Sequence, residues 1–338
     1  MQRFIIKKFL FYVLTFFVAT IFIWAIPRLM PGDPIKDLVS EIYNAIETGG
    51  ANVPEKTKLL YEHFVKKFGL DKPLWEQYFI YLKSILSFDF GFSIAFYPRK
   101  VAELTLSALP WSLALLIPAQ IVGWLIGNYL GALAAYFRGK IDSIIFSIFL
   151  FISRIPYYWL ALVLAYFFAF YIPIFPFGGA YSWGKIPSLA LDFIIDLLMH
   201  YALPFLSLVL IIIGGQAIGM REMMLYELGS DYIEYGKNLG ISDSKLLKYA
   251  FRNAILPQIT GLALSISSSV SGQVVTEAVF AYPGVGNLLY IGILREDYPL
   301  IQGAFLILLI AVLSANFIID ILYAYIDPRI RLVYRGER

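Results

Sequence analysis

Cysteine is absent from this chain of 338 residues, and histidine occurs only twice, at His63 and His200. Without cysteine there is no disulfide framework, no thiolate metal site and no cysteine nucleophile. Two histidines so far apart in sequence leave little basis for a histidine-built metal or protease site. The phosphate-binding pattern Gly-x-x-x-x-Gly-Lys-Ser/Thr is also missing, which argues against an ATP site of that kind. We therefore predict no catalytic and no metal-binding residues.

Charged side chains are scarce as well, at 15% of residues, whereas 59% of residues are hydrophobic. A soluble domain has about 25% charged and about 45–50% apolar residues. The apolar residues occur in long runs, and a run of about 18 or more indicates a membrane span. The net charge of +3 is too small to indicate a nucleic-acid partner. The first expected partner is therefore the lipid bilayer.

Six apolar runs are long enough to cross a membrane. They cover residues 9–26, 108–137, 144–172, 199–220, 256–280 and 300–326. Only helices and closed barrels satisfy their backbone groups in lipid, and uninterrupted apolar runs favour helices over barrel strands. We predict an all-α membrane protein with six transmembrane helices.

Lysine and arginine near the span ends indicate the orientation, because cytoplasmic loops are enriched in them. Four clusters fall on one side of the spans, against Lys185 and Arg295 in the two short loops on the other side. The clusters are Arg3, Lys7 and Lys8; Arg138 and Lys140; Arg221, Lys237, Lys245, Lys248 and Arg252; and Arg329, Arg331, Arg335 and Arg338. Both termini are therefore predicted to be cytoplasmic.

This orientation divides the chain into four parts. Residues 1–26 hold the N-terminus and the first transmembrane helix. Residues 27–107 mix charges of both signs with aromatic residues and are predicted to form an external subdomain. Residues 108–327 form a core of five transmembrane helices, which includes a cytoplasmic loop over residues 220–256. Residues 328–338 form a cytoplasmic tail.

The cytoplasmic loop is predicted to contain a short helix, because residues typical of a helix start and a helix end flank it. Asp231 is a candidate N-cap with Glu234 three residues later, which is a capping-box pattern. Gly240 stands where a helix-terminating glycine belongs. Gly236 lowers helix stability by roughly 1 kcal/mol relative to alanine, and we interpret it as a place where a partner approaches closely. A second helix is predicted to begin near Ser242 and to lead towards Pro257.

The same loop resembles a family motif. Glu234-Tyr235-Gly236, then Gly240, and later Leu256-Pro257, resemble the "EAA" loop of the permease subunits of bacterial ABC importers. Tyr235 and Gly236 depart from the alanines of that motif. The ending Arg252 to Pro257 is similar to the longer loop of the dipeptide/oligopeptide/nickel permeases.

Further segments with the same resemblance run along nearly the whole chain in order. They are residues 30–34 (Met-Pro-Gly-Asp-Pro), residues 69–78, residues 277–286, Asp297-Tyr298-Pro299, Gln302-Gly303 and Asp327-Pro328-Arg329. Each segment alone is a weak signal. Together, in register with six predicted spans, they make the resemblance specific.

The resemblance implies a pore-forming permease subunit of an ATP-driven importer in the cell (inner, cytoplasmic) membrane. It implies a second homologous permease subunit, two cytoplasmic ATPase subunits that hold ATP and magnesium, and an external solute-binding protein. The loop would then be a coupling helix that docks on an ATPase, with Glu234, Tyr235, Gly236, Gly240, Arg252 and Pro257 as coupling residues. The usual cargo of the family is a di- or oligopeptide, although similar permeases carry nickel or oligosaccharides.

Four polar residues within or near the spans are candidates for the translocation pathway. They are Gln273, Glu277, Gln216 and Arg154. An ionisable residue at membrane depth is costly and suggests a functional role. The alternative for each glutamine is interhelical hydrogen bonding, and for Glu277 it is an interfacial structural bond beside Tyr282. For Arg154 the alternatives are a pairing with a carboxylate, with Asp320 as the candidate, and an extension of the side chain to the membrane interface.

Two other classes of protein fit the sequence less well. An ion-coupled secondary transporter would show buried acid–base pairs near the midplane and, usually, inverted repeats. The chain has scattered single charges and no visible repeat. An intramembrane enzyme would need a nucleophile with a base, or a carboxylate pair, and His200 has no evident partner.

Overall fold

The computed structural model describes residues 2–29, 62, 65–66, 71–137 and 139–326. Within these ranges the chain is helical and has no strand, apart from one isolated bridge between Phe92 and Lys100. Several predictions fall outside the described residues. They concern residues 30–34, most of the rest of the predicted external subdomain up to residue 70, and the tail over residues 328–338. The fold class is therefore confirmed as all-α.

Four of the described helices are long and apolar enough to cross a membrane, and a bent pair of helices raises the number to five if it forms one span. The four are α1 (Gln2–Arg28), α5 (Val101–Phe137), α8 (Leu191–Leu228) and α12 (Tyr298–Ile326). The predicted fifth span is also helical, as part of α10 (Asp243–Val279). Six spans remain a prediction.

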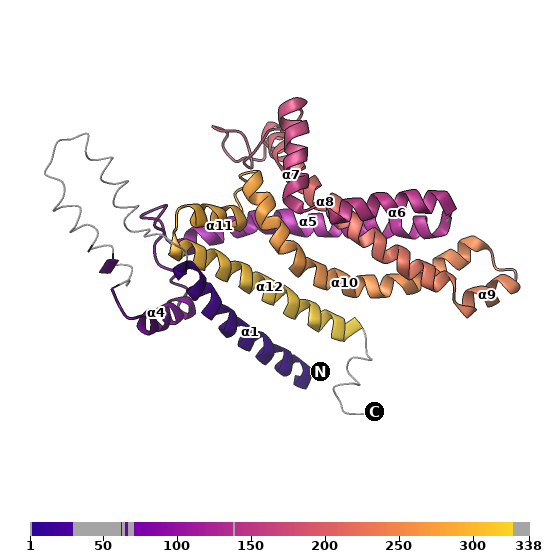
Figure 1. The fold of residues 1–338 in the computed structure, drawn as a ribbon, viewed down its shortest axis with the longest axis horizontal. Coiled ribbons are helices and arrows are strands. Elements are labelled where there is room, and N and C mark those ends of the chain that lie inside the picture. The colour runs from indigo at the N-terminus through magenta and orange to yellow at the C-terminus, as the bar shows by residue number, and fades with distance from the viewer. Residues whose placement is uncertain (1, 30–61, 63–64, 67–70, 138, 327–338) are drawn as a thin grey trace. The chain divides into compact units, whose positions relative to one another are not determined.

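The chain separates into two compact units, which we describe one at a time. The first comprises residues 1–110 and 284–338. In it α1 packs along α12 (Figure 1), and Gln302 Nε2 of α12 donates to the Trp24 carbonyl of α1 (3.4 Å). Asp320 accepts a hydrogen bond from Tyr12 (2.7 Å) and pairs with Lys8 (2.9 Å). The sequence suggested Arg154 as a candidate partner of Asp320, but its contacts in this unit are with α1.

The start of α12 is fixed by Asp297, whose side chain is fully buried. One carboxylate oxygen accepts a hydrogen bond from the Leu300 backbone N–H (3.0 Å), which caps the helix. The other accepts from the Ser93 hydroxyl and from the Ala95 N–H (2.9 Å). Burial raises the pKa of Asp297, although these donors act in the opposite direction. The Asp-Tyr-Pro segment thus fastens the 93–95 turn to α12.

The second unit comprises residues 111–283 and is organised around α8. The middle of α5 lies against α8 through glycines spaced four residues apart. A Cβ atom on Gly123 would lie 2.6 Å from Ile212 Cγ2, and one on Gly127 would lie 2.8 Å from the Ile213 carbonyl oxygen. Gly131 makes a comparable contact with the Ala217 carbonyl. The small residues therefore let the two backbones approach closely.

The predicted third span is broken at Pro156. α6 (Gly139–Arg154) and the helical segment that follows it meet at an angle of 97°. This second segment consists of α7 (Tyr157–Ala165) and the π-helical turn η1 (Tyr166–Tyr171). Pro156 is the N-cap of α7, a place where its missing N–H costs nothing. The span over residues 144–172 is therefore bent at this point.

Candidate functional site

The predicted loop helix exists as α9 (Asp231–Asn238), between the end of α8 and the start of α10 (Figure 1). Its N-cap is Ser230 in an extended conformation, and Asp231 is the first helical residue, so the predicted cap was wrong by one position. The Ser230 hydroxyl donates backwards to the Glu227 carbonyl instead of capping α9. Gly240 has a φ of +74°, the left-handed conformation expected of a terminating glycine.

The inner face of α9 is held by Ile233. This side chain is 1% exposed and belongs to a buried cluster with Met224 of α8 and with Leu246 and Ala250 of α10. The cluster also includes Ala132 and Ala135 of α5. One buried side chain therefore ties the short helix to the ends of three long ones.

Gly236 lies on the same buried face. A Cβ atom there would lie 2.7 Å from Leu246 Cδ2 and 3.6 Å from Ile241 Cδ1. The sequence indicates close approach by a partner at this glycine. The close approach in the structure is with the chain's own α10, because Leu246 fills the space that a side chain at position 236 would need.

A polar network at the exposed side of this junction links α8, α9 and α10. The Tyr232 hydroxyl donates to Glu227 Oε2 (2.6 Å) and accepts from Asn253 Nδ2 (3.1 Å). Burial, followed by the bond to Glu227, raises the pKa of Tyr232, so the phenol keeps its proton and its role as donor. Glu227 and Asn253 were not among the predicted residues, because their spacing follows no helical or capping pattern.

The outer face of α9 presents large side chains to its surroundings. Tyr235 is 66% exposed and Leu239 is 62% exposed, and Tyr226 at the end of α8 is 76% exposed. Glu234 is exposed as well, and so are Arg252 and Pro257 on α10. Pro257 lies inside α10, which continues through it as one helix. Of the six predicted coupling residues, Glu234 and Tyr235 share α9 with the buried Gly236, and the other three flank it.

A second connection at this end of the unit joins α6 to α8. Arg221 binds both carboxylate oxygens of Asp142, from Nε (2.5 Å) and from Nη2 (2.6 Å), and its guanidinium lies 4.5 Å from the centre of the Phe146 ring. Such a bidentate pair is geometrically specific. The junction of α8, α9 and α10 is therefore linked through α8 to α6.

Two of the predicted pathway residues lie in the interior of this unit. Gln273 is 4% exposed and Glu277 is 1% exposed. Gln273 Nε2 donates to Glu277 Oε1 and to the Ser112 carbonyl of α5, both at 2.6 Å. Ser269 and Ser265 lie one and two turns before Gln273 on α10, and both form hydrogen bonds with the Gln120 side chain of α5. These bonds form a polar line between α5 and α10.

The other two predicted pathway residues are more accessible. Gln216 is half-buried on α8 beside Gly127, and Arg154 is exposed at the end of α6, immediately before the bend. No cluster of three His, Cys, Asp or Glu side chains with metal-binding geometry occurs in the described part of the chain.

The chain is similar in sequence to known membrane transport proteins. A family model described as the inner membrane component of binding-protein-dependent transport systems matches residues 127–332. The oligopeptide transport system permease protein AppB of Bacillus subtilis is 32% identical, over 98% of this chain and 99% of its own length. The oligopeptide permease OppB of Haemophilus influenzae is 33% identical over 98% and 100%. The dipeptide permease DppB of Escherichia coli K12 is 28% identical over 98% and 99%.

Proposed function

The chain belongs to the family of inner membrane components of binding-protein-dependent transport systems, and from this premise we propose that it is a pore-forming permease subunit of an ATP-driven peptide importer. It is a multi-pass protein of the cell membrane. The observation that carries the proposal is α9, a short helix with a buried inner face and an exposed aromatic outer face, joined to the ends of three long helices.

The proposed topology has six spans with both termini in the cytoplasm and the 27–107 segment outside. The asymmetry of lysine and arginine supports this orientation. It puts α9 in the cytoplasm, where an ATPase is accessible, and it puts the 93–95 turn and Asp297 on the outer side.

In the proposed assembly, two homologous permeases form the pore between them. Two cytoplasmic ATPase subunits bind below, hold the ATP and magnesium, and receive α9 of each permease in a groove. Closure of the ATPase pair on ATP displaces α9, and the displacement reaches α8 and α10 through Ile233 and through the Tyr232 network. The spans then switch between inward-facing and outward-facing arrangements, and hydrolysis resets them.

The proposed cargo is a di- or oligopeptide delivered by an external binding protein. The names of the relatives support this choice, since AppB and OppB are oligopeptide permeases and DppB is a dipeptide permease. We propose that Arg154 and Gln216, the more accessible of the four polar candidates, contact the cargo on its route. Gln273 and Glu277 would instead keep α10 aligned with α5 along that route.

The test is a purification of the tagged chain from its native membranes in mild detergent, with identification of the proteins that accompany it. The experiment is repeated with Glu234→Arg and Tyr235→Arg combined, which reverses one charge and adds another on the outer face of α9 without touching Ile233. We expect a P-loop ATPase and a second permease with the wild type, and loss of the ATPase alone from the double variant.

The matched control is Trp183→Arg. Trp183 is a fully exposed aromatic residue in the loop that our topology puts on the external side. This control should retain the ATPase as the wild type does. A stable complex without any ATPase would contradict the importer and favour an ion-coupled transporter, and loss of the ATPase from the Trp183 control would contradict the role of α9.

A further inference from the structure

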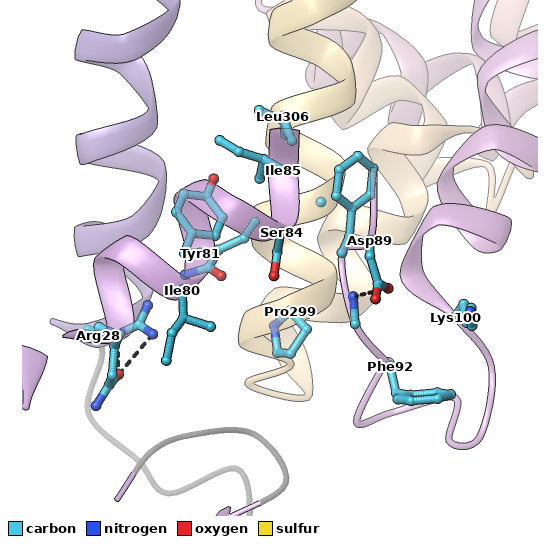
Figure 2. Close-up of a pocket in the computed structure, with 15 residues that line it drawn as sticks. Arg28, Ile80, Tyr81, Ser84, Ile85, Asp89, Phe92, Lys100, Pro299 and Leu306 are labelled. Atoms are coloured by element: carbon cyan, nitrogen blue, oxygen red, sulfur yellow. Dashed lines mark hydrogen bonds between the residues drawn. The ribbon is translucent and has the colours of Figure 1, made fainter. Parts of the chain in front are cut away.

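The first unit contains a cavity of about 320 Å³ at the end of α1, between α4 (Leu74–Leu86), the segment before α5, and α12 (Figure 2). Arg28 lies at one side of it, and Tyr81, Ser84 and Ile85 of α4 form a wall. Asp89 and Lys100, whose charges offset each other, lie on the side away from Arg28 (Figure 2). The cavity therefore carries the net positive charge of Arg28.

Among the described residues, the acceptors that bind Arg28 are neutral. Its Nη1 donates to the Trp24 carbonyl (2.9 Å), and its Nε and Nη2 donate to Gln77 Oε1 (3.2 and 3.0 Å). Gln77 is fixed in turn, because its Nε2 donates to the Lys72 carbonyl (2.7 Å). A guanidinium has five N–H donors, so two remain after these bonds. No carboxylate in the described ranges pairs with this half-buried cation.

Further donors next to Arg28 are unsatisfied within the described part of the chain. The Tyr81 hydroxyl and Trp24 Nε1 are buried and have no hydrogen-bond partner there. Burial raises the pKa of Tyr81, so its hydroxyl stays protonated. Buried polar groups are nearly always hydrogen-bonded, and a buried charge is nearly always paired. The positive charge of Arg28 and its two remaining N–H donors fit an anionic group with acceptor oxygens, and Tyr81 lines the same cavity.

A second, apolar groove lies on the same two helices. It has a volume of about 340 Å³ and is lined by Ile21 and Trp24 of α1 and by Leu74, Trp75 and Tyr78 of α4. Trp24 belongs to this groove, and its ring lies 4.3 Å from the Arg28 guanidinium. A charged site and an apolar groove therefore meet at Trp24.

The position along α1 matches the surface of a membrane. A helix of 27 residues is about 40 Å long, whereas the hydrocarbon layer is about 30 Å thick. Arg28 and Trp24, in the last turns of α1, are therefore at the level of lipid headgroups, where tryptophan and arginine are favoured. Basic sites between membrane helices bind anionic headgroups.

We propose that α1 and α4 form a binding site for one anionic phospholipid, with its phosphate against Arg28 and an acyl chain in the groove of Ile21, Trp24, Leu74, Trp75 and Tyr78. The lipid supplies acceptor oxygens for the two remaining N–H groups of Arg28, and its chain covers apolar side chains that are exposed in the isolated subunit. Such a lipid holds the segment before α5 against the first transmembrane helix. This proposal is independent of the transported cargo.

The test uses the full chain with whatever subunits accompany it, transferred to nanodiscs that contain equal parts of phosphatidylglycerol and phosphatidylcholine, released into detergent and weighed by native mass spectrometry. We expect the wild type to retain phosphatidylglycerol in preference to phosphatidylcholine. Arg28→Gln should reduce retention about tenfold, the effect of losing a charge-assisted hydrogen bond. Arg28→Lys, which keeps the charge, should keep the preference with weaker retention and guards against a folding defect in the glutamine variant.

Two further variants test whether lipid retention depends on Arg28 itself and on the apolar groove. Arg99→Gln removes an equal charge from the same unit at an exposed site paired with Glu103, and it should behave as the wild type does. Leu74→Asp places a charge in the apolar groove and leaves Arg28 unchanged, and it should also release the lipid. Equal retention by the wild type and Arg28→Gln would overturn the proposal. Displacement of the lipid by millimolar glycerol phosphate, or full retention by Leu74→Asp, would overturn it in favour of a site for free phosphate.

Discussion

The backbone of Gly127 in α5 lies so close to α8 that a methyl group on it would stand 2.8 Å from the Ile213 carbonyl oxygen. Because the neighbouring atom belongs to the backbone, it cannot move aside as the tip of a side chain does. Gly123 and Gly131 make similar contacts one turn away on either side. The packing of these two helices therefore depends on the absence of side chains along one stripe of α5.

We expect Gly127→Ala to lower the free energy of unfolding by about 1–3 kcal/mol, the usual cost of forcing an extra methyl group into a packed interface. Gly215→Ala on α8 is the matched control, since a Cβ atom there has nothing within 4 Å. That control should be neutral or stabilising by up to about 1 kcal/mol. Thermal unfolding of both variants in the same detergent measures the difference, and equal melting temperatures would contradict this account of the interface.

The contact of Gly236 with Leu246 gives a second prediction. Gly236→Ala should weaken the docking of α9 on α10 and raise amide hydrogen exchange in α9 about tenfold, equivalent to about 1.4 kcal/mol. Adding Leu246→Val removes the methyl group that would clash, and should restore much of the protection. The comparison isolates the pair, because each change is made alone and together.

Gly240→Ala serves as the control for that experiment. It strains the left-handed end of α9 but meets no neighbouring atom within 4 Å. Its effect should therefore not be relieved by Leu246→Val. If Leu246→Val rescued Gly240→Ala as well as Gly236→Ala, the contact between Gly236 and Leu246 would not be the cause.

The helices and the boundaries of α9 and α10 could be predicted from the sequence, because each depends on residues that are close together in the chain. Long apolar runs predict helices at each of the six positions, and Gly240 and Ser242 mark the end of α9 and the start of α10. The cap of α9 was misplaced from Ser230 to Asp231, since both residue types cap helices and the capping-box spacing favoured the second.

Contacts between residues that are far apart in the sequence could not be predicted in this way. The sequence attributed Gly236 to a partner protein because spacing cannot identify Leu246 as its neighbour. It suggested Asp320 as a partner of Arg154, whereas Asp320 binds Lys8 and Tyr12 more than 300 positions away in the chain. Glu227 and Asn253 meet at Tyr232 only because α8, α9 and α10 converge.

The pair of Arg221 and Asp142 joins α8 to α6 and allows a third prediction. Both side chains are largely buried, and the two bonds form one bidentate contact. We expect a coupling energy of about 1–3 kcal/mol from a double-mutant cycle of Arg221→Met and Asp142→Asn. The same cycle at Arg99 and Glu103, a pair that is more than half exposed, should give about 0–0.5 kcal/mol. Similar values for the two pairs would show that the bidentate contact does not strengthen the junction of α6 and α8.

Asp297 gives a prediction about pH. Its pKa is raised by burial above the value of an unfolded aspartate, about 3.9, so the folded state binds the proton more tightly than the unfolded state. Its contribution to stability is therefore fully present below about pH 4 and is lost as the pH rises through the folded pKa. Relative to Asp297→Asn, which does not titrate, the wild type should lose stability over this window and then reach a plateau. Melting temperatures of both proteins in a pH series measure this difference.

A second variant at the same site tests whether the stability falls or rises with pH. The Ser93 hydroxyl donates to the Asp297 carboxylate and favours its ionised form. Ser93→Ala should therefore raise the pKa of Asp297 further and extend the loss of stability to higher pH. A difference between wild type and Asp297→Asn that stays constant with pH, or a window that moves to lower pH in Ser93→Ala, would contradict a buried and titrating Asp297. The sign of the shift matters here, because a carboxylate held mainly by its donors would instead gain stability as the pH rises.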